Sequence, residues 1–152
     1  MLATSLVATL HFVCAFGIAA VLFFEWLTFS RTPTLQEAKH LAQADRWYGI
    51  FAGLLLVIGF VRAYHFEKGW AYYAGNSFFH LKLTLFLAIG LLSIVPTVRF
   101  IRWRPELTAG RAPQVSEAQY RRVALCLALQ MLLIVPLLLS ASLMAHGVGS
   151  HG

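Results

Sequence analysis

Four long apolar stretches dominate the chain and limit it to one class of fold. Each is close to the roughly 20 residues that a helix needs to cross the hydrocarbon core of a bilayer. Backbone polar groups in lipid must be satisfied within the protein, and a helix achieves this by itself. The sequence therefore predicts an all-α integral membrane four-helix bundle of up-down-up-down topology. It forms a single membrane domain, 1–152, with helices at about 6–27, 45–63, 78–98 and 119–145.

Composition supports this interpretation, because 59% of the residues are hydrophobic and only 12% are charged. Soluble domains carry about twice that share of charge. The first apolar stretch has no basic segment before it and is too long for the apolar region of a secretory signal, so we expect it to remain as a helix. Cys14 and Cys126 fall in different predicted helices at opposite depths, which argues against a disulfide.

The positive charges predict an orientation. The chain has a formal net charge of +6, and most of its basic residues lie in the first and third connections between helices. Basic loops stay in the cytoplasm, so both termini are expected outside the bacterial cytoplasmic (inner) membrane. The positive charge thus indicates the orientation in the membrane and is compatible with contacts to anionic lipids. We expect no nucleic-acid partner.

Ionisable side chains gather in the predicted outer leaflet half. Each costs roughly 2 to 3 kcal/mol or more in hydrocarbon, so such residues usually face a bundle interior and have a partner or a function. Two histidines on separate helices at similar depth can bind a haem iron from opposite faces. Imidazole also suits copper or zinc, and a histidine can simply form an interhelical hydrogen bond. The residues in this half are His11, Arg62, His65, His80, Lys82 and His146.

Helical spacing separates the two polar residues of the "FFHLKL" segment. Lys82 lies about 200° around the helix from His80 at roughly 100° per residue, so the two cannot reach one atom. The spacing favours His80, together with His11, as the inward-facing pair. Lys82 is expected to extend toward the headgroups, with ligand binding as the alternative. Arg62 is similarly expected at the interface, or else at a phosphate or carboxylate.

Two acidic residues and two glycines receive simpler interpretations. Glu25 shares a helical stripe with His11 and is expected to be an interfacial acid, with a proton relay as the alternative. Asp45, beside Arg46, is predicted to begin a helix in solvent. Gly49 and Gly53 have a GxxxG spacing, which predicts close approach of a neighbouring backbone.

A family resemblance rests on His11 early in the first helix and on "FFHLKL" at the start of the third. In these features the chain resembles the HemJ and CopD-like group of four-helix bacterial membrane proteins, closest to an uncharacterised branch of small predicted membrane proteins. The resemblance implies haem b, with His11 and His80 at or near the haem iron and Lys82 at a propionate or substrate carboxylate. It also implies a redox activity, possible oxidation of protoporphyrinogen, and a site between the first and third helices.

Other functions remain open at this level. The chain is compatible with a non-catalytic accessory or assembly subunit of a larger membrane complex, and with a small CopD-like metal transporter. Partners expected from the sequence are membrane lipids, a porphyrin or quinone, and a second copy or larger complex. No residue is assigned a catalytic role.

Overall fold

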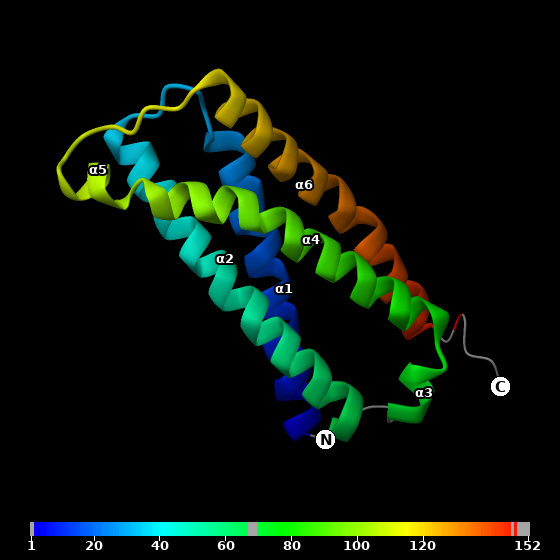
Figure 1. Ribbon diagram of the computed structural model, residues 1–152. Coiled ribbons are helices and arrows are strands. Elements are labelled where there is room, and N and C mark those ends of the chain that lie inside the picture. Colours follow the sequence, from blue (N-terminus) through cyan, green and yellow to red (C-terminus); the bar gives the residue numbers. More distant parts are fainter. Residues whose placement is uncertain (1, 67–69, 147, 149–152) are drawn as a thin grey trace.

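The structure is a computed structural model that describes residues 2–66, 70–146 and 148. The all-α prediction is confirmed, since helices account for every regular element of the described part (Figure 1). Four segments are long and apolar enough to cross a membrane: Leu2–Thr28, Leu35–His65, Ser77–Thr108 and Glu117–Met144. The elements are α1 (Leu2–Thr28), α2 (Leu35–Val61), the π-helix η1 (Arg62–Phe66), α3 (Trp70–Ala74), α4 (Ser77–Arg102), α5 (Arg104–Thr108) and α6 (Glu117–Ala145).

The long helices form two closely packed pairs. Helix α1 lies along α2, and α4 lies along α6, whereas the contacts between the two pairs are fewer. Helices α1 and α4 are diagonal to one another in the bundle and have no direct backbone proximity in the described part of the chain. Space between the pairs is therefore available for cavities.

The main hydrophobic core ties the bundle together at the end that carries α5. Phe29, which follows α1, stacks on Trp103 and on Tyr120 with ring centroids 6.3 and 5.7 Å apart. Phe100 is buried beside the same ring. A second, smaller cluster at the opposite end contains Ala63, Tyr73, Phe79 and Met144. The bundle is thus tightly packed at one end and more loosely filled at the other.

Helix α2 begins ten residues earlier than the predicted start at 45. Thr34 caps it: the Thr34 hydroxyl accepts from the Glu37 amide, and the Glu37 carboxylate accepts from the Thr34 amide. Such a capping box satisfies two amides that the first turn leaves without helical partners. Asp45 therefore lies inside the helix and is only 7% exposed, so the prediction that it begins a helix in solvent is wrong.

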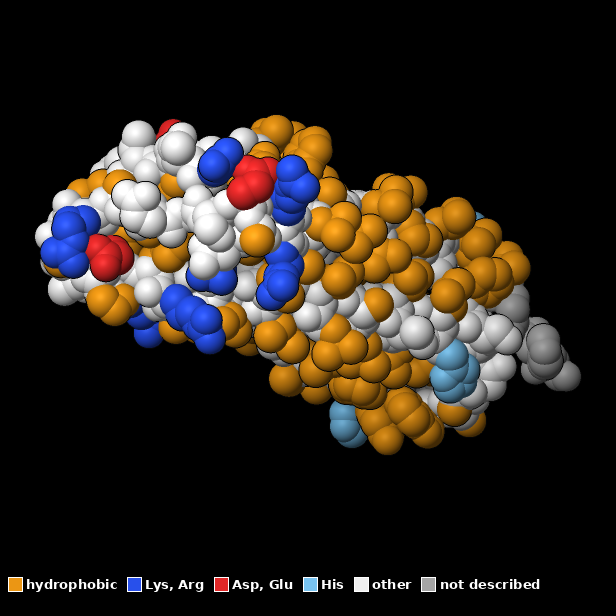
Figure 2. Space-filling view, turned by 45° about the horizontal axis from the view of Figure 1, so that its top comes forward, with side chains coloured by type: hydrophobic (Ala, Val, Ile, Leu, Met, Phe, Trp, Pro, Cys, Tyr) orange, Lys and Arg blue, Asp and Glu red, His pale blue; other side chains and the backbone are white. Residues whose placement is uncertain are grey.

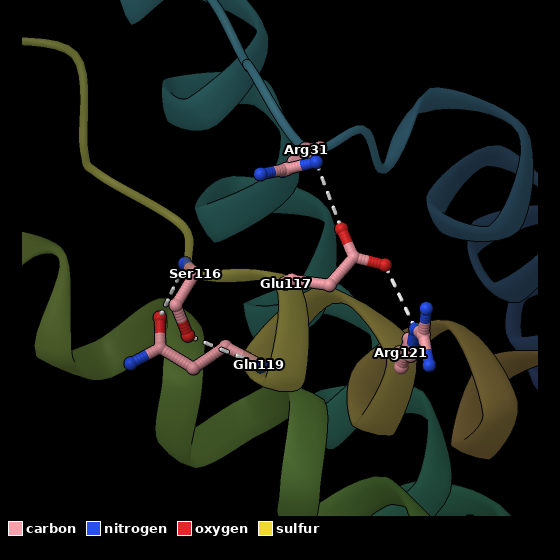
Figure 3. Close-up of polar contacts among 5 residues, drawn as sticks. All are labelled: Arg31, Ser116, Glu117, Gln119 and Arg121. Carbon is pink, nitrogen blue, oxygen red and sulfur yellow. Dashed lines mark hydrogen bonds and ion pairs between the residues drawn. The ribbon is translucent and has the colours of Figure 1, made fainter.

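Helix α6 begins after its N-cap, Ser116. The Ser116 hydroxyl accepts from the Gln119 amide, and the Gln119 side chain accepts from the Ser116 amide (Figure 3). Next to it, the Glu117 carboxylate contacts Arg31 from the first connection at 2.9 Å and Arg121 at 2.8 Å. These ion pairs are exposed, so they contribute little to stability. Their main effect is to hold the first connection next to the start of α6.

Charged side chains gather at the α5 end of the molecule. Figure 2 shows the Lys and Arg side chains over this end and hydrophobic side chains over most of the remaining face. This distribution agrees with the sequence pattern in which the first and third connections are basic. The direction in which the bundle crosses the membrane remains a prediction.

The close approach of helices occurs at Gly17, and the prediction of close packing at Gly49 and Gly53 is wrong. A Cβ added at Gly49 or Gly53 would meet no atom within 4 Å. A Cβ at Gly17 would lie 2.7 Å from the ring of Phe51. Spacing alone does not show which glycine faces a neighbour.

Replacing Gly17 with alanine is expected to lower the free energy of unfolding by about 1 to 3 kcal/mol, because the Phe51 ring must shift within a packed interface. Gly49→Ala is the matched control and should leave stability unchanged or slightly raised, since alanine has the higher helix propensity. Denaturant titration of both variants in detergent measures the difference. Equal stability of the two variants would contradict the packing assigned to Gly17.

Candidate functional site

A cavity of about 760 Å³ opens at the end of the bundle away from α5. We call it the terminal cavity, because the start of α1 and the end of α6 lie beside it. Its volume falls within the roughly 300–1,000 Å³ of typical ligand pockets. The polar and sulfur-bearing side chains in its wall are His11, Arg62, Tyr72, Tyr73, Lys82, Ser142 and Met144.

His11 enters the terminal cavity from α1 and lies against Gly59 of α2. A Cβ at Gly59 would be 3.5 Å from the Cε1 atom of His11, so the missing side chain leaves room for the imidazole. The ring of Phe12 packs edge-on to the imidazole, with centroids 6.4 Å apart. The histidine is thus half-buried in a fixed place between two helices.

Two cationic side chains face the same space. Arg62 follows the last residue of α2, and its guanidinium carbon lies 5.9 Å from the centroid of the Phe12 ring. Lys82 comes from α4 and is half-buried in the cavity wall. Guanidinium and ammonium groups bind carboxylates well when water is partly excluded. The terminal cavity therefore suits an amphipathic ligand that carries negative charge.

His80 lies outside the terminal cavity. It is exposed, and its Nε2–H donates to the carbonyl oxygen of Ala74 at 2.7 Å, which ties the end of α3 to α4. The helical spacing does separate His80 from Lys82, but Lys82 is the inward-facing member. The structure thus brings together three of the four proposed binding residues, His11, Arg62 and Lys82, and leaves His80 apart.

The remaining histidines at this end have local contacts or face outward. His146 is exposed, and its Nδ1–H donates to the carbonyl oxygen of Ser142 at 2.8 Å. His65 is also exposed. Among the described residues, no group of three or more His, Cys, Asp or Glu side chains is placed to hold a metal ion. A bare metal site with several such ligands therefore has no support in this part of the chain.

Several cavity residues were not identified from the sequence. Helix α3 turns Tyr72 and Tyr73 into the cavity wall, and Tyr73 is buried. Gly59, near the end of α2, is about one helical turn before Arg62, the first residue of η1. This spacing is the only sequence signal that could have placed Gly59 on the same face as Arg62. Met144 of α6 lies in the cavity wall and belongs to the same small hydrophobic cluster as Tyr73 and Phe79.

Two further cavities extend from the terminal cavity toward the middle of the bundle. The first, of about 130 Å³, shares His11, Gly59 and Lys82 with it. The second, of about 530 Å³, shares Ala15, Leu55 and Phe86 with the first, and its wall includes Tyr48, Ser93 and Thr97. The hollow region between the helix pairs thus runs from the terminal cavity to the opposite half of the bundle.

The fold and the cavity define a small four-helix membrane protein with a polar site at one end. The family model described as "Predicted membrane protein (DUF2214)" matches residues 3–149, and the chain belongs to this family. The family description supports a membrane protein, and it does not extend to the HemJ and CopD-like group. The searches of curated proteins and of solved structures give no match.

Proposed function

We propose that this protein binds haem b in the terminal cavity, with His11 as a ligand of the iron. The observation that carries the proposal is the convergence of His11, Arg62 and Lys82 from three elements on one cavity. The resemblance to the HemJ and CopD-like group supports the choice of a porphyrin. We also propose that the protein resides in the bacterial cytoplasmic membrane with this cavity in the outer half.

The residues present fit this ligand chemically. A neutral imidazole is a common axial ligand of haem iron, and a methionine thioether, as in Met144, is another. Arg62 and Lys82 supply two positive charges, which matches the two propionates of haem b. Phe12, Phe79 and Leu138 provide apolar walls for the macrocycle. The proposal assigns no ligand role to His80, because it is bonded to Ala74.

Haem b supplies one-electron chemistry when it is bound, and the protein supplies its orientation and its electrostatic environment. The two cations would favour the binding of any porphyrin with carboxylates, including the substrate implied by the resemblance, protoporphyrinogen. A redox role with a porphyrin or quinone partner is therefore part of the proposal.

Filling the space beside His11 is expected to abolish haem binding without removing a ligand. Gly59→Leu places a side chain in the terminal cavity and in the cavity next to it. Gly53→Leu is the matched control on the same helix, because a Cβ there would meet no atom within 4 Å. The measurement is a haem titration of each purified variant, followed by the Soret absorbance.

The proposal expects saturable binding by the native protein and by Gly53→Leu, with a loss of at least about tenfold in affinity for Gly59→Leu. Equal affinity of all three proteins would contradict the assigned cavity. Absence of binding by the folded native protein would contradict haem as the ligand.

A further inference from the structure

A second polar group of side chains lies in the half of the bundle nearer α5, away from the terminal cavity. All four long helices contribute to it. Glu25 is 2% exposed, Asp45 7%, Tyr48 5% and Gln130 0%, so these side chains are inside the protein. We call Glu25, Asp45, Tyr48, Thr97 and Gln130 the buried polar cluster.

Two hydrogen bonds connect helices within the buried polar cluster. The Tyr48 hydroxyl of α2 donates to Oε1 of Gln130 on α6 at 3.0 Å. The Thr97 hydroxyl of α4 donates to Oδ1 of Asp45 on α2 at 2.7 Å. The cluster therefore crosses the looser boundary between the two helix pairs, where its groups are held in fixed positions.

Two buried polar atoms of this cluster have no hydrogen-bond partner among the described residues. They are Oε1 of Glu25 and Nε2 of Gln130. An unsatisfied buried polar atom costs roughly 1 to 3 kcal/mol, so a native structure seldom keeps one without a ligand, a water or a function. These two side chains are also among the most completely buried in the molecule. The hydrogen bonding of the buried polar cluster is thus incomplete when only the described side chains are considered.

The charges of the cluster are also unbalanced. Glu25 and Asp45 are close enough to act on one another electrostatically. In the described part of the chain, the ion pairs of acidic side chains belong to Glu106 and Glu117, and no lysine or arginine forms an ion pair with Glu25 or Asp45. Two like charges buried together disfavour double ionisation, and lipid around the bundle strengthens this effect. Binding of one proton would relieve this repulsion.

We propose that Glu25 and Asp45 form a proton-binding pair that holds one proton, carried by Glu25, at neutral pH. Asp45 is the ionised member because its Oδ1 accepts from Thr97, and hydrogen bonding stabilises a carboxylate. Glu25 has an oxygen without a donor, so it gains less from ionisation. Proton uptake transfers H⁺ from water to an oxygen of Glu25. Because two ionised carboxylates carry a charge of −2, one bound proton changes the charge of the pair to −1.

The groups that surround the pair do not supply an alternative positive charge. Tyr48 on α2 is the other titratable group of the cluster, while Thr97 on α4 and Gln130 on α6 are uncharged. Cys126, one turn before Gln130 on α6, is also buried. The arginines nearest in sequence to the carboxylates and to Thr97 are Arg31, Arg46 and Arg99. Arg31 and Arg46 are exposed, with Arg31 paired to Glu117, and Arg99 is half-buried in the wall of a separate cavity beside α4 and α6.

The cavity of about 530 Å³ reaches the neighbours of the pair, and the two carboxylates themselves lie behind its wall. Tyr48 and Thr97 belong to its wall, and through Ala15 and Phe86 it adjoins the space that leads to His11. A proton bound at the pair would thus lie near the end of the hollow region that is closer to α5, and the terminal cavity lies at the other end. This placement suits proton-coupled chemistry across the bundle, whatever ligand the terminal cavity holds.

Infrared spectroscopy of the purified full chain, free of haem and in a detergent without carbonyl groups, tests the proposal. A protonated carboxyl has a carbonyl stretching band that ionised carboxylates lack. The native protein should show this band at neutral pH, and labelling glutamate with ¹³C should shift it. Glu25→Gln should abolish the band, and Asp45→Asn should retain it at an altered frequency. Glu117→Gln is the control, because Glu117 is paired with Arg31 and Arg121 at the surface, and it should leave the band unchanged.

Three results would overturn the proposal. One is a folded native protein without the band at neutral pH. Another is a band that persists in Glu25→Gln. The third is a band that sodium chloride removes while choline chloride does not, because the pair would then hold a sodium ion in place of the proton. The isosteric variants preserve side-chain volume, and circular dichroism verifies that each is folded.

Discussion

His11→Ala is expected to lower haem affinity by more than about 100-fold, whereas His80→Ala should leave it unchanged. Loss of a residue that only supports a metal ligand already costs roughly 10- to 100-fold in metal affinity, so loss of the ligand itself should cost more. His11 lines the terminal cavity, while His80 is exposed and bonded to Ala74. Haem titration followed at the Soret band measures both affinities.

The two histidine variants control for one another, because each removes one imidazole from the same end of the bundle. His80→Ala removes a hydrogen bond to the α3–α4 connection and should lower stability slightly, which denaturation in detergent will report. The reverse pattern, with binding lost in His80→Ala and retained in His11→Ala, would show that the site lies elsewhere. Equal loss in both variants would indicate a requirement for both histidines and contradict the cavity as the structure has it.

Lys82→Met and Arg62→Met are each expected to weaken the binding of haem b by about 10- to 100-fold. A hydrogen bond to a charged group contributes about 1.5 to 3 kcal/mol, and 1.4 kcal/mol corresponds to a factor of ten. Haem dimethyl ester lacks the two carboxylates, so its affinity should change much less in the same variants. Methionine keeps most of the apolar stem, which limits the loss of packing.

Lys39→Met is the control for this experiment, since Lys39 is exposed near the start of α2 at the opposite end of the bundle. It should bind haem b and the ester as the native protein does. Lys82→Met and Arg62→Met could lower the affinity for haem b and for the ester equally. The two cations would then affect only the shape of the cavity and would not contact the propionates. The assignment of these residues to the carboxylates would then be wrong.

The fold was predictable from the sequence because lipid leaves few alternatives to a helix. The lengths of the apolar stretches identified four helices, and the predicted start of the last one, at about 119, lies close to the observed start of α6 at Glu117. The start of α2 was missed because its first ten residues are polar and lie beyond the apolar stretch. Thr34 and Glu37 form the capping box that begins this helix, and a search for that pattern would have found it.

The sequence predicted the helices better than it predicted which side chains point into the bundle. Helical spacing shows that His80 and Lys82 point apart, but only the packing of α4 on α6 and α2 decides which one turns inward. Asp45 was placed in solvent because of its neighbour Arg46, although adjacent residues on a helix point in different directions. Its burial depends on Thr97, which is 52 residues away in sequence.

The sites depend on contacts between elements that are distant in the chain. Tyr73 enters the terminal cavity because α3 folds back against α4, which no local pattern indicates. Gln130 belongs to the buried polar cluster because of its bond to Tyr48, which is 82 residues away in sequence. The sequence thus placed His11, Arg62 and Lys82 of the terminal cavity at a shared depth, and it did not reveal the buried polar cluster.

The most direct test of the central claim is the absorption spectrum of the purified native protein after addition of haem b, recorded before and after reduction with dithionite. The proposed function predicts stoichiometric binding, with a Soret band that sharpens on reduction and visible bands of a histidine-ligated haem. A folded protein whose spectrum is the sum of its own and that of free haem would contradict the assignment of the terminal cavity.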